Sequence, residues 1–366
     1  MVINMIKSKA LAMDENAQQL YADKKMFELV ERAVALGVGI DRKGVYSTAY
    51  LKTILKRIVT KVRTIMQAGV RLGGLRPDMG LHLYASLAQS IVKYALPLTA
   101  ASSMQVQKLD EQQARFARDY LSLPPTTPPH AAKAELGLLD YDLASTISKM
   151  LLHHRINSSP DTFTRGLVKW DIGGHTTRSK CETELRTLMP HITWGNFANM
   201  PYRVAKADLK EAAEAMQVRR WNDLEHTLGH ETAYASRSKP RWGIERSLHL
   251  IAPTDVVAYI QVRNGAGIGE HLEHGGMCAL CAQHVQSEAH ILWACMGTRG
   301  ARNKFQAEAT QVAPEAMRRL NELQPRQAFH FLMGAGARDV SEVEWAKFQP
   351  VAVKFVVEAF GGCRET

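Results

Sequence analysis

The chain has 366 residues, which is long enough for two or three domains that each bury a core of their own. Hydrophobic residues make up 46% of it, and no run of about 18 apolar residues predicts a membrane span. The net charge of +10 favours a polyanionic partner, most often nucleic acid. Five cysteines in this length form no secreted disulfide framework, and there is no signal-peptide pattern, so we expect a reducing compartment, nucleus or cytoplasm.

Residues 33–40 are small and apolar, with glycine at positions 37 and 39. This composition predicts one buried strand, in which the glycines let another backbone come close.

The clearest helix is predicted between Ser47 and Val70, where apolar residues recur every three or four positions. No acidic residue occurs between Lys43 and Arg76. Because a solvated helix face normally mixes both signs of charge, we expect this basic face to lie along a phosphate backbone, with an ordinary basic surface as the alternative. The basic residues that fall largely off the apolar stripe are Lys52, Lys56, Arg57, Lys61 and Arg63.

Further helices are predicted from apolar periodicity and from proline and glycine stops. The adjacent residues His153 and His154 would point to different faces of one of them, so we expect both at the surface rather than on a metal ion. The helices are expected at residues 79–94, 103–121, 131–136, 143–156, 205–228, 299–310, 314–323 and 342–360. Near the C-terminus, a small closing core is expected from Phe331, Trp345, Phe348, Val351, Phe355 and Val356.

Three of the five cysteines lie in one motif, C-x2-C-x8-H-x4-C, formed by Cys278, Cys281, His290 and Cys295. This Cys3His set is one that zinc prefers in structural sites, and the alternative is a group of buried thiols beside a surface histidine. Residues 287–294 favour a helix, but ligands five positions apart on a regular helix point roughly 140° away from each other. We therefore expect the helix to loosen before Cys295.

Two other zinc-site classes fit the motif poorly. A zinc deaminase places H-x-E well upstream of P-C-x-x-C and keeps a fourth zinc position open. Here His271-Leu272-Glu273 lies only four residues before Cys278, Met277 stands in place of proline, and His290 and Cys295 would fill the coordination shell. A RING-like module would need two ligand quartets, and only one is visible.

Short motifs spread along the chain occur in a recognisable order. Asn4-Met5-Ile6-Lys7-Ser8-Lys9 comes first, followed by Leu36-Gly37-Val38-Gly39-Ile40 and the basic helix. Next come residues 90–94, then residues 108–118 with Leu123-Pro124, and then Ala134-Glu135-Leu136-Gly137-Leu138. Arg263-Asn264-Gly265 directly precedes the region of the cysteine motif. Over about residues 1–165 and 255–366, this order resembles the reverse transcriptases of non-LTR retrotransposons of the jockey and ingi type.

The resemblance implies a mainly α fold: a helical thumb-like bundle, a small β remnant of a polymerase palm, and a C-terminal Cys3His zinc knuckle with flanking helices. Ala35 replaces an aromatic residue that the family usually has before the Leu-Gly-Val strand. Five regions are expected: a palm-end remnant at 1–42, a thumb-like domain at 43–165, a linker or poorly defined helical region at 166–254, the CCHC knuckle at 255–300, and C-terminal helices at 301–366.

The resemblance does not extend to the catalytic residues. A reverse transcriptase holds Mg²⁺ with three carboxylates, and part of this set comes from a Tyr-x-Asp-Asp turn that would precede Asn4. Tyr21-Ala22-Asp23-Lys24 lies on the wrong side of that run and has Lys24 in place of the second aspartate. We therefore expect no catalytic residue in this chain, and Mg²⁺ only where a palm is supplied elsewhere.

The implied function is that of a nucleic-acid-binding C-terminal portion of an RNA-directed DNA polymerase, inactive alone. The expected partners are RNA, an RNA–DNA duplex, and the missing palm or endonuclease portion of a longer polyprotein, with the nucleus favoured and no membrane. Arg263 would contact nucleic acid, and Trp293 would stack on a base or pack around a structural Zn²⁺. The alternative is a zinc-stabilised protein-interaction module derived from a retroelement.

Overall fold

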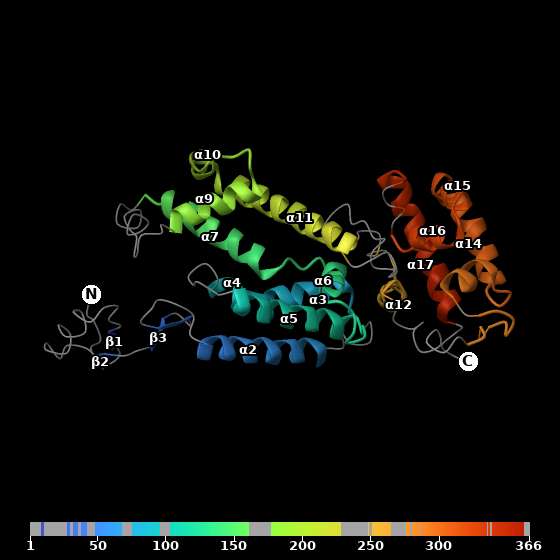
Figure 1. Cartoon of the computed structure of the whole chain (residues 1–366), viewed down its shortest axis with the longest axis horizontal. Coiled ribbons are helices and arrows are strands. Elements are labelled where there is room, and N and C mark those ends of the chain that lie inside the picture. The colour runs from blue at the N-terminus through green and yellow to red at the C-terminus, as the bar shows by residue number, and fades with distance from the viewer. Residues whose placement is uncertain are drawn as a thin grey trace. The chain divides into compact units, whose positions relative to one another are not determined.

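The structure is a computed structural model of the chain and describes residues 9–10, 28–29, 32–35, 38–41, 48–67, 75–95, 103–160, 177–227, 248, 251–264, 276–278, 280–285, 287–334, 336 and 339–361. Over these residues the fold is mainly helical, as predicted (Figure 1). It divides into two compact units, one of residues 1–63, 84–112 and 140–212, and one of residues 64–83, 113–139 and 213–366. These units interleave along the sequence, and the five regions expected from the sequence stay a prediction.

Short strands lie in the first unit. Strand β1 (Lys9–Ala10) pairs in parallel with β2 (Glu28–Leu29), and β3 (Arg32–Ala35) pairs antiparallel with β4 (Val38–Asp41). The prediction of one strand over residues 33–40 is therefore wrong. The register joins Ala35 to Val38 and leaves two residues between the strands, which is the commonest connection of an antiparallel pair.

The first unit also holds a group of packed helices. Helix α2 (Thr48–Gln67) begins in this unit, and η2 (Ala85–Gln89), a π-helical turn, leads into α4 (Ser90–Ala95). Helix α4 packs against α7 (Tyr141–Asn157), which packs against α9 (Thr177–Leu188) and α10 (Trp194–Asn199). Tyr84 directly precedes η2, and Tyr141 is the first residue of α7. Both side chains are fully buried, and their hydroxyls lie 3.2 Å apart, so this hydrogen bond holds the start of α7 against the start of η2.

The two adjacent histidines of α7 are buried, so the expectation that they lie at the surface is wrong. The Nε2 atom of His154 lies 2.8 Å from the Met200 carbonyl oxygen, and the His153 ring meets Trp194 edge-on. Burial lowers the pKa of His153, which favours its neutral form. Helix α10, which periodicity did not reveal, covers this end of α7 and precedes α11 (Tyr202–Thr227).

Several helices of the second unit begin with proline. Proline suits the first turn of a helix, because the amide hydrogen that proline lacks would have no partner within the helix at that position. They are α6 (Pro129–Leu136), α12 (Pro253–Arg263), α15 (Pro314–Asn321) and α16 (Pro325–Leu332). Helices α3 (Pro77–Tyr84) and α5 (Ser103–Tyr120) each contain a boundary between the units, as do α2 and α11.

Helix α17 (Glu342–Gly361) organises the C-terminal part of the second unit. It packs against α12, α15, α16 and α14 (Arg299–Val312), which Figure 1 shows grouped in orange and red. The rings of Phe305 and Phe355 stack at 4.6 Å between centroids, and Phe331 meets Trp345 and Phe348 edge-on. All six residues expected in a closing core are buried, which confirms that prediction.

No helix among the described residues has the length and apolar content to cross a bilayer.

Candidate metal centre

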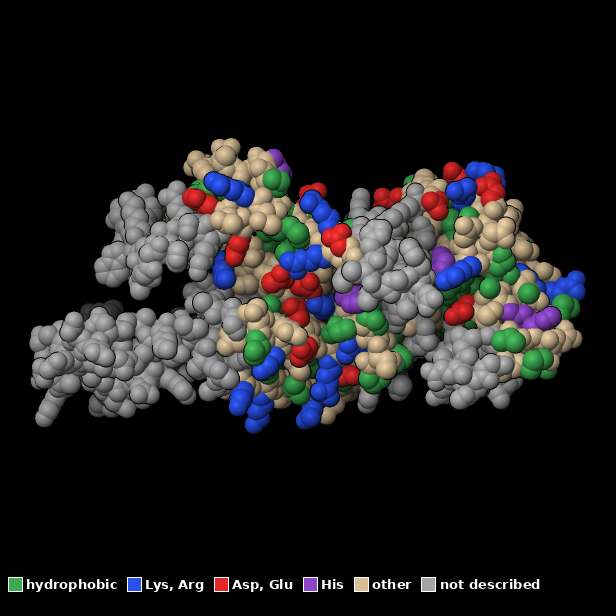
Figure 2. Space-filling view, in the orientation of Figure 1, with side chains coloured by type: hydrophobic (Ala, Val, Ile, Leu, Met, Phe, Trp, Pro, Cys, Tyr) green, Lys and Arg blue, Asp and Glu red, His purple; other side chains and the backbone are tan. Residues whose placement is uncertain are grey.

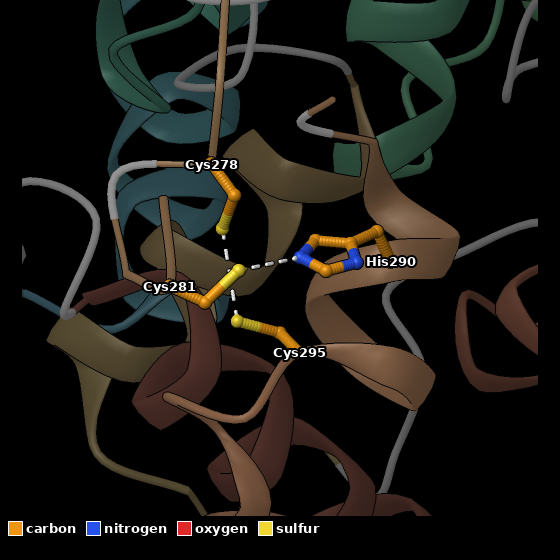
Figure 3. Close-up of side chains that lie close together, drawn as sticks. All are labelled: Cys278, Cys281, His290 and Cys295. Carbon is orange, nitrogen blue, oxygen red and sulfur yellow. Dashed lines mark hydrogen bonds between the residues drawn. The ribbon is translucent and has the colours of Figure 1, made fainter. Parts of the chain in front are cut away.

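The four residues of the cysteine motif converge on one point. Their ligand atoms all lie within 4.8 Å of one another (Figure 3). The Sγ atoms of Cys278 and Cys295 are 3.6 Å apart, and the Cys281 Sγ lies 3.2 Å from the His290 Nε2. Tetrahedral coordination with metal–sulfur bonds of about 2.3 Å places ligand atoms roughly 3.5–3.8 Å apart, so the cluster is close to the size that one ion requires.

A tight turn presents the first two ligands. The Cys278 amide donates to the His284 carbonyl at 2.7 Å, and the Ala282 amide donates to the Cys278 carbonyl at 2.7 Å. Ala282 has a φ of 53°, in the left-handed region, and this residue reverses the chain just after Cys281. Met277 and Val285 then form an antiparallel bridge that closes the turn.

The second pair of ligands comes from a distorted helix. Residues His290–Ala294 form η5, a π-helical turn, and Cys295 is extended with φ −66° and ψ 128°. The predicted loosening of the helix before Cys295 is confirmed. Because the extra residue in a π-helical turn changes the angle between successive side chains, His290 and Cys295 reach the same point.

The local electrostatics suit a metal ligand set. The backbone N–H of Gln283 lowers the pKa of the Cys281 thiol, whereas burial raises the pKa of Cys295 to about 11. Burial, followed by the charges of His284 and Arg302, lowers the pKa of His290, which favours the neutral imidazole, the form that can donate a lone pair to a metal ion. A bound cation would stabilise the deprotonated form of Cys295 that burial alone disfavours.

Two side chains of the following segment hold the second ligand pair in place. The Arg302 guanidinium donates from Nη1 to the Leu292 carbonyl at 3.0 Å and from Nη2 to the Cys295 carbonyl at 3.2 Å. The Thr298 hydroxyl donates to the Ile291 carbonyl, and its oxygen also lies 3.2 Å from the Cys295 carbonyl oxygen. Three thiolates around a divalent ion leave one excess negative charge, and Arg302 brings a positive charge beside it.

One glycine allows the two ligand segments to approach each other. A Cβ atom at Gly297 would lie 2.7 Å from the Cβ of Leu280, which is closer than side chains tolerate. The loop after Cys295 can therefore lie against the turn between Cys278 and Cys281 only because residue 297 has no side chain.

The arrangement is suited to a structural role. Four protein ligands complete a tetrahedral shell, whereas catalytic zinc sites keep one position open for water or substrate. This closed set argues against deaminase chemistry, and the His271–Glu273 run lies outside the described residues.

The basic residues predicted to contact nucleic acid are exposed on α2, while Ile54, Ile58 and Ile65 of the same helix are buried. Figure 2 shows Lys and Arg side chains projecting along the edge formed by α2. Their contact with nucleic acid stays a prediction. The exposed residues are Lys52, Lys56, Arg57, Lys61 and Arg63.

Arg263 does not lie at a nucleic-acid surface, contrary to expectation. The Arg263 residue is 1% exposed, and its guanidinium forms a bidentate ion pair with Glu135. Nε donates to Oε1 at 3.1 Å, and Nη2 donates to Oε2. The Asn264 side-chain amide donates to the same Oε1 at 2.8 Å, and the guanidinium lies over the Tyr259 ring. A buried, neutralised guanidinium cannot reach a phosphate, so Arg263 joins α12 to α6 instead.

Trp293 packs against an aromatic residue of the C-terminal helix. It lies in η5 between two ligands, is partly buried, and its ring centroid is 6.2 Å from that of Phe355 on α17. Trp293 thus packs beside the metal ligands against α17, and its stacking on a base stays a prediction.

Sequence reasoning missed the residues that support the site. Arg302 and Thr298 follow the last ligand without any characteristic spacing, and only the structure shows that they bind its carbonyls. Glu135 and Arg263 both belong to motifs that the sequence singled out, but nothing in either motif indicates that the two residues pair.

No model of a known protein family matches the chain, and no curated protein matches it significantly.

The first prediction concerns the ligands. We expect Cys281→Ser to lower the metal content and to loosen the segment of residues 263–300, because so small a module depends on its metal to fold, while α2 to α7 stay intact. Metal analysis and hydrogen exchange would measure both effects. Cys181→Ser changes a buried cysteine of the other unit and should leave the metal content unchanged; an equal metal content in both variants would contradict the site.

The second prediction concerns Arg302. Arg302→Met removes two hydrogen bonds to the ligand segment, and we expect metal affinity to fall by about 10–100-fold, as for other residues that orient ligands. Competition with a chelator would measure the change. Arg299→Met removes a neighbouring exposed arginine of α14 and should have little effect on affinity.

The third prediction concerns the buried ion pair. Arg263→Met leaves Glu135 charged and buried, and we expect a loss of about 3–5 kcal/mol in unfolding free energy. The double variant Glu135→Met/Arg263→Met should lose less, because it removes both charges. Denaturation followed by tryptophan fluorescence would compare them; additive losses would show that the two side chains do not act as a pair.

Proposed function

We propose that this chain is a nucleic-acid-binding C-terminal portion of a non-LTR retrotransposon reverse transcriptase, held together in part by a structural Zn²⁺ and without polymerase activity of its own. The proposal joins the order of the sequence motifs, the basic face of α2 and the Cys3His cluster. Its partners would be RNA or an RNA–DNA duplex and the remaining parts of the polymerase.

The basic face of α2 is the observation that carries the proposal. Five basic side chains are exposed along one helix whose opposite side is buried, and no acidic residue occurs from Lys43 to Arg76 to neutralise them. A helix with a row of exposed Lys and Arg side chains can lie along the phosphates of a duplex. Such a contact would recognise the shape of the backbone rather than the base sequence. This is the contact that a polymerase thumb needs.

Zinc is the ion that best suits the cluster. Three thiolates and one imidazole at tetrahedral spacing form a set typical of structural zinc, and softer donors of this kind disfavour Mg²⁺ and Ca²⁺. The ion would add folding free energy to a segment that has few regular hydrogen bonds. It would perform no chemistry.

Polymerase activity is not part of the proposal. The 366 residues contain no Tyr-x-Asp-Asp run, and a two-metal polymerase mechanism needs carboxylates at that position. The metal-ligand group of the described residues is the Cys3His cluster, which suits a structural ion rather than a pair of catalytic ones.

The fourth prediction tests nucleic-acid binding. Lys56→Glu/Lys61→Glu should weaken binding to duplex RNA for all sequences alike and make the salt dependence shallower, by roughly one unit of log–log slope for each phosphate that the variant no longer neutralises. Fluorescence anisotropy with two unrelated duplexes at several salt concentrations would measure this. Arg186→Glu/Lys347→Glu makes the same charge change at two other exposed sites and serves as the control.

Three results would contradict this proposal. Equal losses in the two charge-reversal variants would mean that only net charge matters, and a loss confined to one sequence would argue against phosphate contacts. Failure of the unaltered protein to bind any nucleic acid at low salt would favour a zinc-stabilised protein-interaction module.

A further inference from the structure

The ligands of the metal centre differ in how far solvent reaches them. Cys278 and Cys295 are 0% exposed, and His290 is 8% exposed. Cys281 is the most accessible of the four, and residues 282–285 that follow it are all exposed. An ion or a chelator that approaches the centre therefore arrives on the side of Cys281.

A second histidine lies on that side. His284 is exposed, and its ring centroid lies 5.2 Å from that of His290. Its backbone is tied to the site, because its carbonyl accepts a hydrogen bond of 2.7 Å from the Cys278 amide. The backbone N–H groups of Gln283 and His284 also donate to the Cys281 sulfur. His284 is therefore held beside Cys281 and His290, although it is not part of the cysteine motif.

The separation of the two rings is that of imidazoles that can share an ion. Two imidazoles on one tetrahedral ion, each with a metal–nitrogen bond of about 2.0–2.1 Å, have ring centroids roughly 5 Å apart. The observed separation of 5.2 Å agrees with this value. Rotation of the exposed His284 side chain can thus bring one of its nitrogen atoms to an ion that His290 holds.

The resident ligand set leaves His284 no permanent position on the ion. The cluster consists of Cys278, Cys281, His290 and Cys295, which complete a tetrahedron. Zinc prefers four ligands in a structural site and takes a fifth only transiently. A further imidazole can therefore bind only while one of the four ligands leaves, and Cys281 is the ligand that solvent reaches.

We propose that His284 is an exchange ligand, which binds the zinc ion while the Cys281 sulfur leaves it. A zinc–nitrogen bond to His284 forms as the zinc–sulfur bond to Cys281 breaks, and the freed thiolate takes a proton from water. Uptake of the ion follows the same steps in reverse. The inference rests on the Zn²⁺ of the proposed function and does not depend on nucleic-acid binding.

An exchange ligand and a supporting residue have different effects on metal binding. A residue that binds the ion only while it moves lowers the barriers to uptake and to release equally, because both pass through the same arrangement, and the affinity stays unchanged. A residue that orients the resident ligands changes the affinity itself. Rates and affinities measured on the same variant therefore distinguish the two roles.

The fifth prediction uses the zinc-loaded full chain with His284→Ala, which keeps the backbone hydrogen bonds of residue 284. Transfer of zinc to a chromogenic chelator should be about tenfold slower than for the unaltered protein, which corresponds to about 1.4 kcal/mol in the barrier. The equilibrium affinity for zinc, measured by competition with a chelator, should stay the same. The matched control Gln283→Ala shortens the neighbouring exposed side chain and should change neither quantity.

A protein without the Cys281 sulfur isolates the zinc–His284 bond. In Cys281→Ser, which binds zinc more weakly, His284 can remain on the ion as the fourth ligand. Cys281→Ser/His284→Ala should bind zinc at least about tenfold more weakly than Cys281→Ser, because a lost ligand costs no less than a lost supporting residue. X-ray absorption of the zinc that Cys281→Ser retains should show two sulfur and two nitrogen neighbours.

Three outcomes would overturn the inference. They are an unchanged transfer rate in His284→Ala, a loss of affinity in His284→Ala as large as the change in rate, and equal zinc affinity of Cys281→Ser with and without His284. If the unaltered protein binds zinc and His284→Ala behaves like Gln283→Ala, only the exchange role has failed. If the unaltered protein binds no zinc, the metal centre of the proposed function has failed as well.

Discussion

Three thiols and one imidazole within 4.8 Å of one another are the constraint on which the C-terminal part of the structure depends. As thiolates the three sulfur atoms would repel one another, and as thiols they offer only weak hydrogen bonds to hold the segment together. A divalent cation removes this conflict, because it stabilises the thiolates and binds all four groups at once. The left-handed residue Ala282 and the π-helical turn His290–Ala294 both serve to bring the ligands to that point.

From the metal centre, a continuous set of contacts runs through the second unit. Arg302 fixes the ligand segment to α14, and Trp293 packs against Phe355 of α17. Helix α17 packs against α12, and Arg263 at the end of α12 pairs with Glu135 of α6. Loss of the metal should therefore lower local stability most in η5 and in the loop before it. The effect should be smaller at α6, where the buried ion pair and apolar packing stabilise the structure independently of the metal.

The sequence predicted those features that depend on local spacing. The ligand set, the loosened helix before Cys295 and most helix positions follow from short-range patterns, and the buried face of α2 follows from its apolar stripe. Features that depend on distant parts of the chain were missed or wrong. Burial of His153 and His154 requires α10, and burial of Arg263 requires Glu135, which lies 128 positions earlier. A basic residue beside a metal motif looks the same in sequence whether its partner is a phosphate or a carboxylate.

X-ray absorption at the zinc edge of the purified chain tests the central claim most directly, because it reports the atoms bound to the ion. The account predicts one zinc per chain, bound by three sulfur atoms at about 2.3 Å and one nitrogen atom at about 2.0–2.1 Å. A shell with fewer than three sulfur atoms, or a protein that takes up no zinc, would contradict it.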